Sequence, residues 1–105
     1  MNQFIESFNK VQKEVHETAK SKGWWDTERN DGELIALMHS ELSEALEELR
    51  KYPELNRTRV SSELADVIIR IMDYSEARGM DIGNAIIEKH EYNKSRPHKH
   101  GGKRF

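Results

Sequence analysis

The sequence of 105 residues lacks cysteine altogether and has only two prolines and few aromatic residues. The absence of cysteine excludes a disulfide framework, a thiolate metal site and a cysteine nucleophile, and it fits a reducing compartment. The N-terminus lacks the apolar core of a signal peptide, and no apolar run approaches the roughly 20 residues of a membrane span. The net charge of -2 provides no general attraction to nucleic acid or to anionic membranes. We therefore expect a cytoplasmic protein with no membrane partner and no specific nucleic-acid partner.

The chain also lacks the features of a β protein or of a multidomain protein. It shows no alternating strand pattern, no internal repeat and no linker between two domains. Its length fits one small domain, expected over residues 1–97 and followed by a basic tail over 98–105. Hydrophobic residues make up 35% of the chain and charged residues 34%, which leaves a thin core. Association with further copies of the chain is therefore expected.

Apolar residues recur at helical spacing, which predicts an all-α fold of four helices. The predicted helices cover about 2–22, 31–51, 58–79 and 81–94. Asp31 is the expected cap of the second helix, and Pro53 breaks the pattern after it. The third helix is expected to begin at Thr58 or Ser61.

Each of the two middle helices carries an apolar stripe that predicts its buried face. The stripe of the second helix consists of Leu34, Met38, Leu42, Ala45 and Leu49. The stripe of the third helix consists of Val60, Leu64, Val67, Ile68, Ile71 and Met72. Ile69 lies on the side opposite that stripe, so the third helix is predicted to be buried nearly all round.

Two carboxylate pairs carry most of the information, Glu41-x-x-Glu44 and Glu63-x-x-Asp66. The i, i+3 spacing of each pair puts both acids on one face of a helix. If the chain folds back over 52–56 as an antiparallel hairpin, residue 41 comes level with 66 and residue 44 with 63. Carboxylates brought together in this way raise one another's pKa unless a cation lies among them. Oxygen ligands without cysteine suit a hard ion, Mg2+ or alternatively Mn2+.

The position of Glu41 supports this metal site. At about 100° per residue, Glu41 falls inside the apolar arc of its helix, where a lone carboxylate is costly and a paired or metal-bound one is not. Glu48 shares the face of the first pair and is a candidate outer ligand. A di-iron bundle is a weak alternative because no histidine follows a glutamate at the required spacing. An EF-hand is excluded because the chain has no acidic twelve-residue loop.

Two further groups of residues are candidate substrate ligands. Lys89, Asn93 and Arg96 share one face by their i, i+4, i+7 spacing and are suited to hold phosphate oxygens. The alternative is a solvated basic segment that complements the helix C-terminus. Trp24 and Trp25 precede the first acidic helix and face opposite ways, so only one of them can be fully core. The other can stack on a flat ligand such as a nucleobase.

The order of the tryptophans, the two acid pairs and the later Lys, Asn and Arg along the chain resembles that of the all-α nucleoside triphosphate pyrophosphohydrolase superfamily. This superfamily includes the MazG-like and dCTP-pyrophosphatase-like enzymes. The signature of that superfamily is similar to Glu-x-x-Glu, a short hairpin and Glu-x-x-Asp, which here gives Glu41, Glu44, Glu63 and Asp66. The aromatic loop before the acids and the Lys, Asn and Arg after them also match, so the resemblance covers about residues 20–97. Some pyrimidine-specific members carry an aromatic residue where this chain has Arg70, which leaves the base preference open.

The resemblance implies a short, single-domain member: a four-helix MazG-like bundle with an antiparallel acidic helix hairpin, present as a homodimer or homotetramer. It implies a Mg2+-dependent enzyme that converts a (d)NTP to the (d)NMP and pyrophosphate. In that role the four acids hold the metal and are the catalytic residues, with Glu44 as the candidate that orients or deprotonates the attacking water. Lys89, Asn93 and Arg96 hold phosphate oxygens, and Trp24 or Trp25 covers the base. A neighbouring subunit commonly completes the site in this superfamily.

Two other functions stay open at the level of the sequence. One is a non-catalytic helical interaction module whose acidic seam binds a partner and whose basic tail contacts nucleic acid. The other is a hydrolase of a related pyrophosphate compound, such as a phosphoribosyl-nucleotide intermediate. Stabilisation by Mg2+ distinguishes the first of these from the enzyme, and a substrate panel distinguishes the second.

Overall fold

The computed structural model of the protein describes residues 2–52 and 57–97. These residues form four helices: α1 (Asn2–Ser21), α2 (Asp31–Lys51), α3 (Arg57–Ala77) and α4 (Ile82–Lys94). The described part of the chain contains no β-strand, so the predicted all-α, four-helix class is confirmed. The predicted turn residues 53–56 and the predicted tail 98–105 lie outside the described residues. None of the described helices combines the length and apolarity that a membrane span requires.

The caps of α2 and α4 explain where those helices begin. Asn30, rather than the predicted Asp31, caps α2: its backbone is extended and its Oδ1 accepts the Glu33 N–H at 2.8 Å. Asp31 is instead the first helical residue, where a negative charge complements the helix dipole. Asp81 caps α4 in the same way, because its Oδ1 accepts the Asn84 N–H at 3.0 Å.

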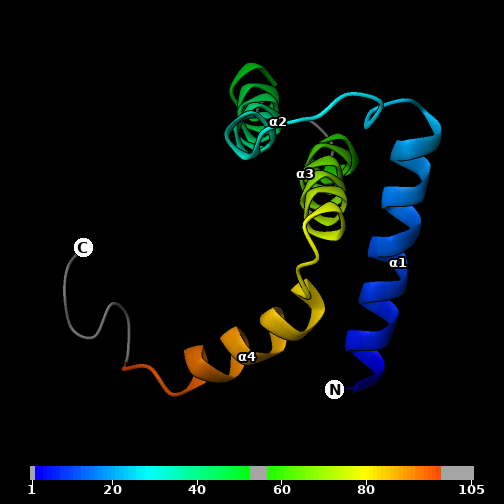
Figure 1. Ribbon diagram of the computed structural model, residues 1–105. Coiled ribbons are helices and arrows are strands. Elements are labelled where there is room, and N and C mark those ends of the chain that lie inside the picture. The colour runs from blue at the N-terminus through cyan, green and yellow to red at the C-terminus, as the bar shows by residue number, and fades with distance from the viewer. Residues whose placement is uncertain (1, 53–56, 98–105) are drawn as a thin grey trace.

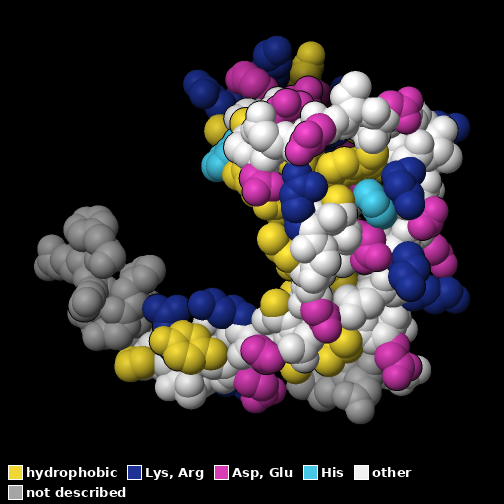
Figure 2. Space-filling model, viewed as in Figure 1, with side chains coloured by type: hydrophobic (Ala, Val, Ile, Leu, Met, Phe, Trp, Pro, Cys, Tyr) yellow, Lys and Arg dark blue, Asp and Glu magenta, His cyan; other side chains and the backbone are white. Residues whose placement is uncertain are grey.

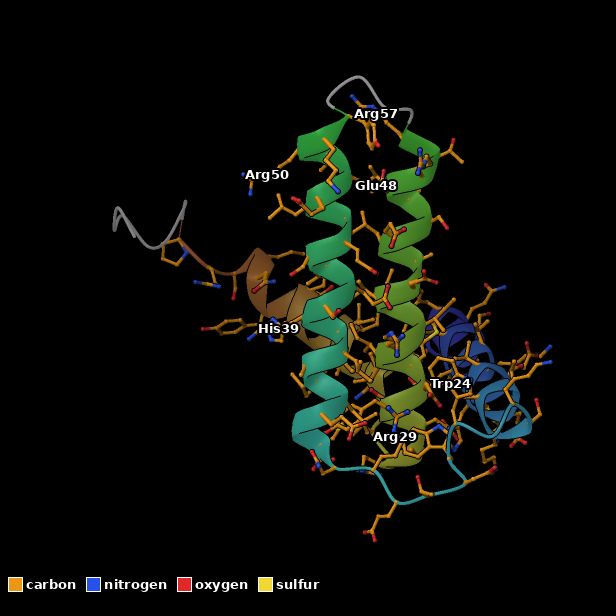
Figure 3. The ribbon with its side chains drawn as sticks, turned by 90° about the horizontal axis from the view of Figure 1, so that it is seen from above. Trp24, Arg29, His39, Glu48, Arg50 and Arg57 are labelled. Atoms are coloured by element: carbon orange, nitrogen blue, oxygen red, sulfur yellow. The ribbon has the colours of Figure 1, made fainter. Side chains whose placement is uncertain are left out.

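The four helices pack as a bundle in which α3 is central, since it packs against both α2 and α1. Helices α2 and α3 lie side by side and antiparallel (Figure 3). Helix α1 crosses α3, and α4 packs on α1 and then leads away from α2 (Figure 1). The α2–α3 pair is therefore a layer only two helices wide, with one flank left uncovered within a single chain.

The core is smaller than the apolar stripes predict. The buried hydrophobic residues among those described are Leu34, Ala45, Val67 and Met72. Leu42, Leu49, Leu64, Ile68 and Ile69 are each between 43% and 51% exposed. The prediction that the third helix is buried nearly all round is therefore wrong for the chain taken alone. The reason is geometric: α1 covers only part of α3, and none of the described helices packs closely on the remaining flank.

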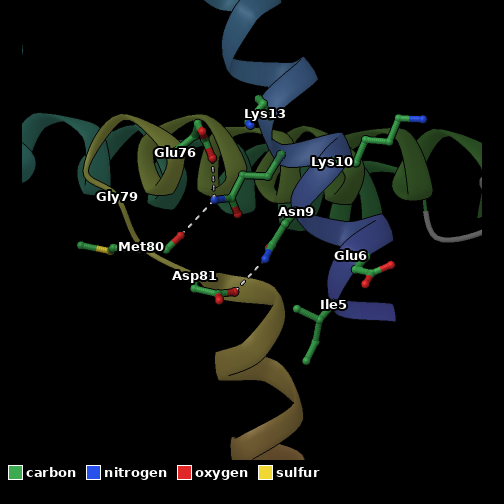
Figure 4. Close-up of a pocket in the computed structure, with 10 residues that line it drawn as sticks. Ile5, Glu6, Asn9, Lys10, Lys13, Glu76, Gly79, Met80 and Asp81 are labelled. Atoms are coloured by element: carbon green, nitrogen blue, oxygen red, sulfur yellow. Dashed lines mark hydrogen bonds between the residues drawn. The ribbon is translucent and has the colours of Figure 1, made fainter. Parts of the chain in front are cut away.

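A polar joint, not an apolar one, fixes α1 to the α3–α4 connection (Figure 4). Gln12 is only 2% exposed, and its Nε2 donates to Glu76 Oε1 at 3.2 Å and to the Met80 carbonyl at 3.0 Å. Asn9 Nδ2 donates to Asp81 Oδ1 at 2.9 Å. These bonds provide partners for side chains that would otherwise be costly to bury.

Candidate metal centre

Three of the four predicted acids come together. Glu41 and Glu44 on α2 and Glu63 on α3 each place a carboxylate oxygen within 4.8 Å of the other two. They meet because α2 and α3 run antiparallel and each helix presents its acids on the face toward the other. Asp66, the fourth predicted acid, is exposed and lies outside this group. It lines a pocket next to the group, together with Glu41.

Glu41 is half-buried and has a cationic partner. Its side chain is 14% exposed, and Arg70 Nε donates to its Oε1 at 3.0 Å, with Nη2 also 3.0 Å from the same oxygen. The inward position of Glu41 agrees with the sequence analysis. The pairing with Arg70 was not predicted, although Arg70 follows Asp66 by one helical turn and so shares its side of α3. The ion pair offsets the cost of burying the carboxylate.

The electrostatics of the group show the strain of like charges. A hydrogen bond that the protonated Glu44 carboxyl gives to Glu41 raises the pKa of Glu44 above its ordinary 4.5, and the negative charges of Glu41 and Glu63 raise it further. Arg70 acts in the opposite direction but does not reverse the shift. Without a bound ion, these neighbours therefore favour the protonated form of Glu44, and a bound cation would favour the carboxylate.

Glu48 supplies an independent sign that a cation fits here. It follows Glu44 by one turn and lies between α2 and α3 (Figure 3). Its Oε1 is 3.5 Å from Arg59 Nη2, but its Oε2 is buried without a hydrogen-bond partner among the described residues. An unpaired buried acceptor is costly, and a metal ion or a metal-bound water would satisfy it. The donor set consists of carboxylate oxygens, which fits Mg2+ or Mn2+.

Two pockets flank the acids. One, of about 300 Å3, is lined by Trp24, Glu41, Asp66, Ile69, Arg70 and Asp73. The other, of about 400 Å3, is lined by Ser40, Ser43, Glu44, Glu47, Glu48, Lys51 and Glu63. Because Glu41 lines the first pocket and the other two clustered acids line the second, the acidic group stands between them. An extended ligand that occupies both pockets must pass the acids.

The two tryptophans have separate roles in the structure. Trp25 is half-buried, and its Nε1 donates to both carboxylate oxygens of Asp73, at 2.9 and 3.1 Å. His16 Nδ1 lies 2.7 Å from the same carboxylate and completes the anchor. Trp24 is 48% exposed and lines the 300 Å3 pocket. Of the two, Trp24 is therefore the one available to a flat ligand, and Trp25 holds the loop that presents it.

A single chain does not bring the predicted phosphate ligands on α4 to the acids. Helix α4 leads away from α2 (Figure 1). Lys89 on α4 and Arg96, which follows the end of α4, lie 5.2 and 5.9 Å from the ring of Tyr92. Among the described residues, no hydrogen bond, ion pair or pocket joins Lys89, Asn93 or Arg96 to the acidic group. Any role of these residues at the acids requires a second copy of the chain.

A further hollow, of about 600 Å3, lies at the polar joint between α1 and the α3–α4 connection. Its charged lining is mixed: Glu6, Lys10, Lys13, Glu76 and Asp81. Its central polar groups bond mainly to one another (Figure 4), although Gln12 Oε1 is buried without a partner among the described residues. This hollow is therefore a consequence of the joint, and the acidic group between α2 and α3 is the stronger candidate site.

Comparison with known proteins finds no family model, no curated protein and no solved structure that matches the chain. The functional interpretation therefore depends on the chemistry of the site. That chemistry is an exposed group of three glutamates able to bind a metal ion, placed between a pocket with an accessible tryptophan and a second, acidic pocket.

Proposed function

We propose that the protein is a Mg2+-dependent nucleoside triphosphate pyrophosphohydrolase that converts a (d)NTP to the (d)NMP and pyrophosphate, with Mn2+ as an alternative metal. The observation that carries this proposal is the meeting of Glu41, Glu44 and Glu63 beside a pocket lined by the exposed Trp24. The order of these residues along the chain, which resembles that superfamily, supports the same conclusion.

The charges of the site explain why a metal is needed. A triphosphate carries several negative charges, which unneutralised carboxylates would repel. The clustered acids, with Asp66 and Glu48 at their two sides, would hold Mg2+. When bound, Mg2+ neutralises charge on the phosphates and lowers the pKa of a bound water. Glu44 is the candidate base because it is the exposed acid of the three, open to a water at the group.

The reaction fits the arrangement of the two pockets. The base would lie against Trp24 and the phosphates would extend past Glu41 toward the second pocket. Water would attack the α-phosphorus. The bond from this phosphorus to the oxygen that bridges to the β-phosphate would break, and pyrophosphate would leave with that oxygen. Glu44 takes the proton that the water loses. The second pocket, which includes Ser40, Ser43 and Lys51, provides hydroxyl groups and an ammonium group near the departing pyrophosphate.

We also propose that a second copy of the chain covers the open flank of the α2–α3 pair, giving a homodimer or homotetramer. The exposed apolar residues on this flank are Leu42, Leu46 and Leu49 on α2 and Leu64 and Ile68 on α3. Figure 2 shows hydrophobic side chains along the hollow side of the molecule between α2–α3 and α4. Monomeric proteins rarely expose contiguous apolar surface of this kind. We further propose that a neighbouring copy supplies Lys89, Asn93 and Arg96 to the acids.

A product analysis tests the enzymatic proposal. The protein is incubated with Mg2+ and each common or modified (d)NTP, and a phosphoribosyl-nucleotide pyrophosphate compound is included in the panel. Monophosphate plus pyrophosphate supports the proposal, whereas diphosphate plus phosphate contradicts it. Glu63→Gln should reduce turnover at least about 100-fold, because a lost metal ligand removes several kcal/mol of transition-state stabilisation. Glu14→Gln, on the exposed surface of α1, is the matched control and should turn over normally.

A binding measurement separates the enzyme from a non-catalytic interaction module. Mg2+ together with a non-hydrolysable dNTP should raise the melting midpoint of the protein, because a ligand that binds only the native state stabilises it. The interaction module predicts no such rise, and predicts instead an affinity for RNA or DNA that falls with salt.

A further inference from the structure

Arg70 occupies the space between the aromatic part of the site and the acids. Its guanidinium carbon lies 5.4 Å from the centroid of the Trp24 ring, and its Nε and Nη2 each lie 3.0 Å from Glu41 Oε1. The Arg70 side chain is 26% exposed, so it remains open to the 300 Å3 pocket that it lines. Arg70 is the positive group that neutralises Glu41 in the metal-free protein.

We propose that Arg70 is a built-in counter-ion that a divalent cation must displace from Glu41 or share Glu41 with, and that Arg70 then binds the phosphate group nearest the base. This inference rests on the proposed function. Two cations held by one carboxylate repel each other, so Arg70 opposes metal binding. The same charge attracts the polyphosphate, so Arg70 favours substrate binding. Arg70 therefore acts with opposite sign on the two ligands.

The order of groups along the pocket supports the choice of phosphate. Trp24, Arg70 and Glu41 follow one another from the aromatic end to the acids. A nucleotide has the same order: base, then the sugar and its attached phosphate, then the phosphates that share the metal. The guanidinium carries five N–H donors in a planar fork, and its contacts with Glu41 engage one edge of that fork. The remaining donors suit the oxygens of a phosphate.

The test uses metal binding and nucleotide binding as separate readouts. The affinity for Mn2+ without nucleotide is measured by titration calorimetry for the wild type and for Arg70→Gln. The variant should bind Mn2+ more tightly, on the order of five-fold, because a repelling charge next to a metal ligand is gone. Its affinity for a non-hydrolysable dNTP at saturating Mn2+ should fall about ten-fold, because a charge-assisted contact to phosphate is lost.

Two further variants make the result specific. Arg70→Lys retains the charge, so it should bind Mn2+ like the wild type, but it should lose part of the dNTP affinity because an ammonium cannot form the fork. Lys10→Gln removes one positive charge from the exposed surface of α1, at the hollow beside Met80, which shares no lining residue with either pocket beside the acids. Both affinities should stay unchanged, because a distant surface charge is screened.

Each outcome decides one of the two proposals. Unchanged or weaker Mn2+ binding by Arg70→Gln overturns the inference, even if the wild type hydrolyses nucleotides normally. Tighter Mn2+ binding with lost dNTP affinity supports the inference, even if no nucleotide is hydrolysed, in which case only the enzymatic proposal fails. If Arg70→Gln does not fold, equal dNTP affinity of Arg70→Lys and the wild type overturns it. A wild type that binds no Mn2+ overturns both.

Discussion

Replacing Trp25 with Phe tests the division of labour between the two adjacent tryptophans. The indole N–H of Trp25 donates to both oxygens of Asp73, at 2.9 and 3.1 Å, and the Asp73 side chain is only 13% exposed. Phenylalanine keeps an aromatic ring at this position but cannot donate. Asp73 would retain His16 as its remaining partner. The substitution therefore removes a hydrogen bond to a largely buried charged group and keeps a smaller ring beside His16, Arg29 and Arg78.

The expected cost follows from that contact. A hydrogen bond to a charged group contributes about 1.5 to 3 kcal/mol to stability. Because the buried Asp73 carboxylate loses this partner, Trp25→Phe should lower the free energy of unfolding by about 2 kcal/mol. In a domain of this size such a loss lowers the melting midpoint by about 10 °C. In urea it lowers the unfolding midpoint by about 1 to 2 M.

The matched control is the same substitution one residue earlier. Trp24 is 48% exposed and keeps a ring facing Arg70 when replaced by Phe, so Trp24→Phe should cost less than about 0.5 kcal/mol. Both variants and the wild type are unfolded in urea at equal protein concentration and followed by circular dichroism. Equal losses for the two variants, or a larger loss for Trp24→Phe, would refute the assignment of Trp25 as the anchor and Trp24 as the accessible ring.

Three further perturbations have expected signs. Because the pKa of Glu44 is raised, the metal-free protein should lose stability as the pH rises above 4.5. Glu44→Gln should remove that pH dependence and raise the melting midpoint of the metal-free protein near neutral pH. Saturating Mg2+ should remove the same pH dependence in the wild type. Leu46→Lys, at a residue 56% exposed, should lower the mass measured by light scattering to that of one chain, and an unchanged mass would contradict the proposed interface. Gly83→Ala should cost about 1 to 3 kcal/mol in urea unfolding, because its Cβ would lie 2.8 Å from Asn9 Oδ1, whereas Gly32→Ala, with 3.4 Å to its nearest atom, should be neutral or stabilising.

The helices could be predicted from the sequence because their signals are local. Apolar periodicity and capping residues act within one or two turns, so the four segments were found within a few residues of their observed bounds. The core could not be predicted as well, because it depends on which helix covers which flank. Gln12 shows the limit: it is 2% exposed, whereas the apolar residues Phe4 and Val11 on the same helix are 42% and 45% exposed. A glutamine is buried there because distant groups on the α3–α4 connection accept its hydrogen bonds.

The acidic group shows a similar division. The i, i+3 spacing and the antiparallel hairpin place Glu41, Glu44 and Glu63 together, and the structure has them within 4.8 Å. The same register brings Asp66 only to the adjoining pocket. Arg70, which binds Glu41, could not be predicted from periodicity alone, because many arginines lie on helix faces near acids without reaching them.

The metal-free chain has two deficits, and they lie on different flanks of the α2–α3 pair. On one flank, like charges meet at Glu44, and Glu48 Oε2 is buried without a partner in the described part of the chain. On the other, apolar side chains such as Leu42 remain half-exposed. Leu42 follows Glu41 by one residue and so faces about 100° away from it. A cation would neutralise the carboxylates on the first flank. A second copy of the chain would cover the apolar side chains on the other. Because the two surfaces share no side chain, metal binding by the acids should not depend on assembly, whereas phosphate binding should, if α4 of the second copy completes the site.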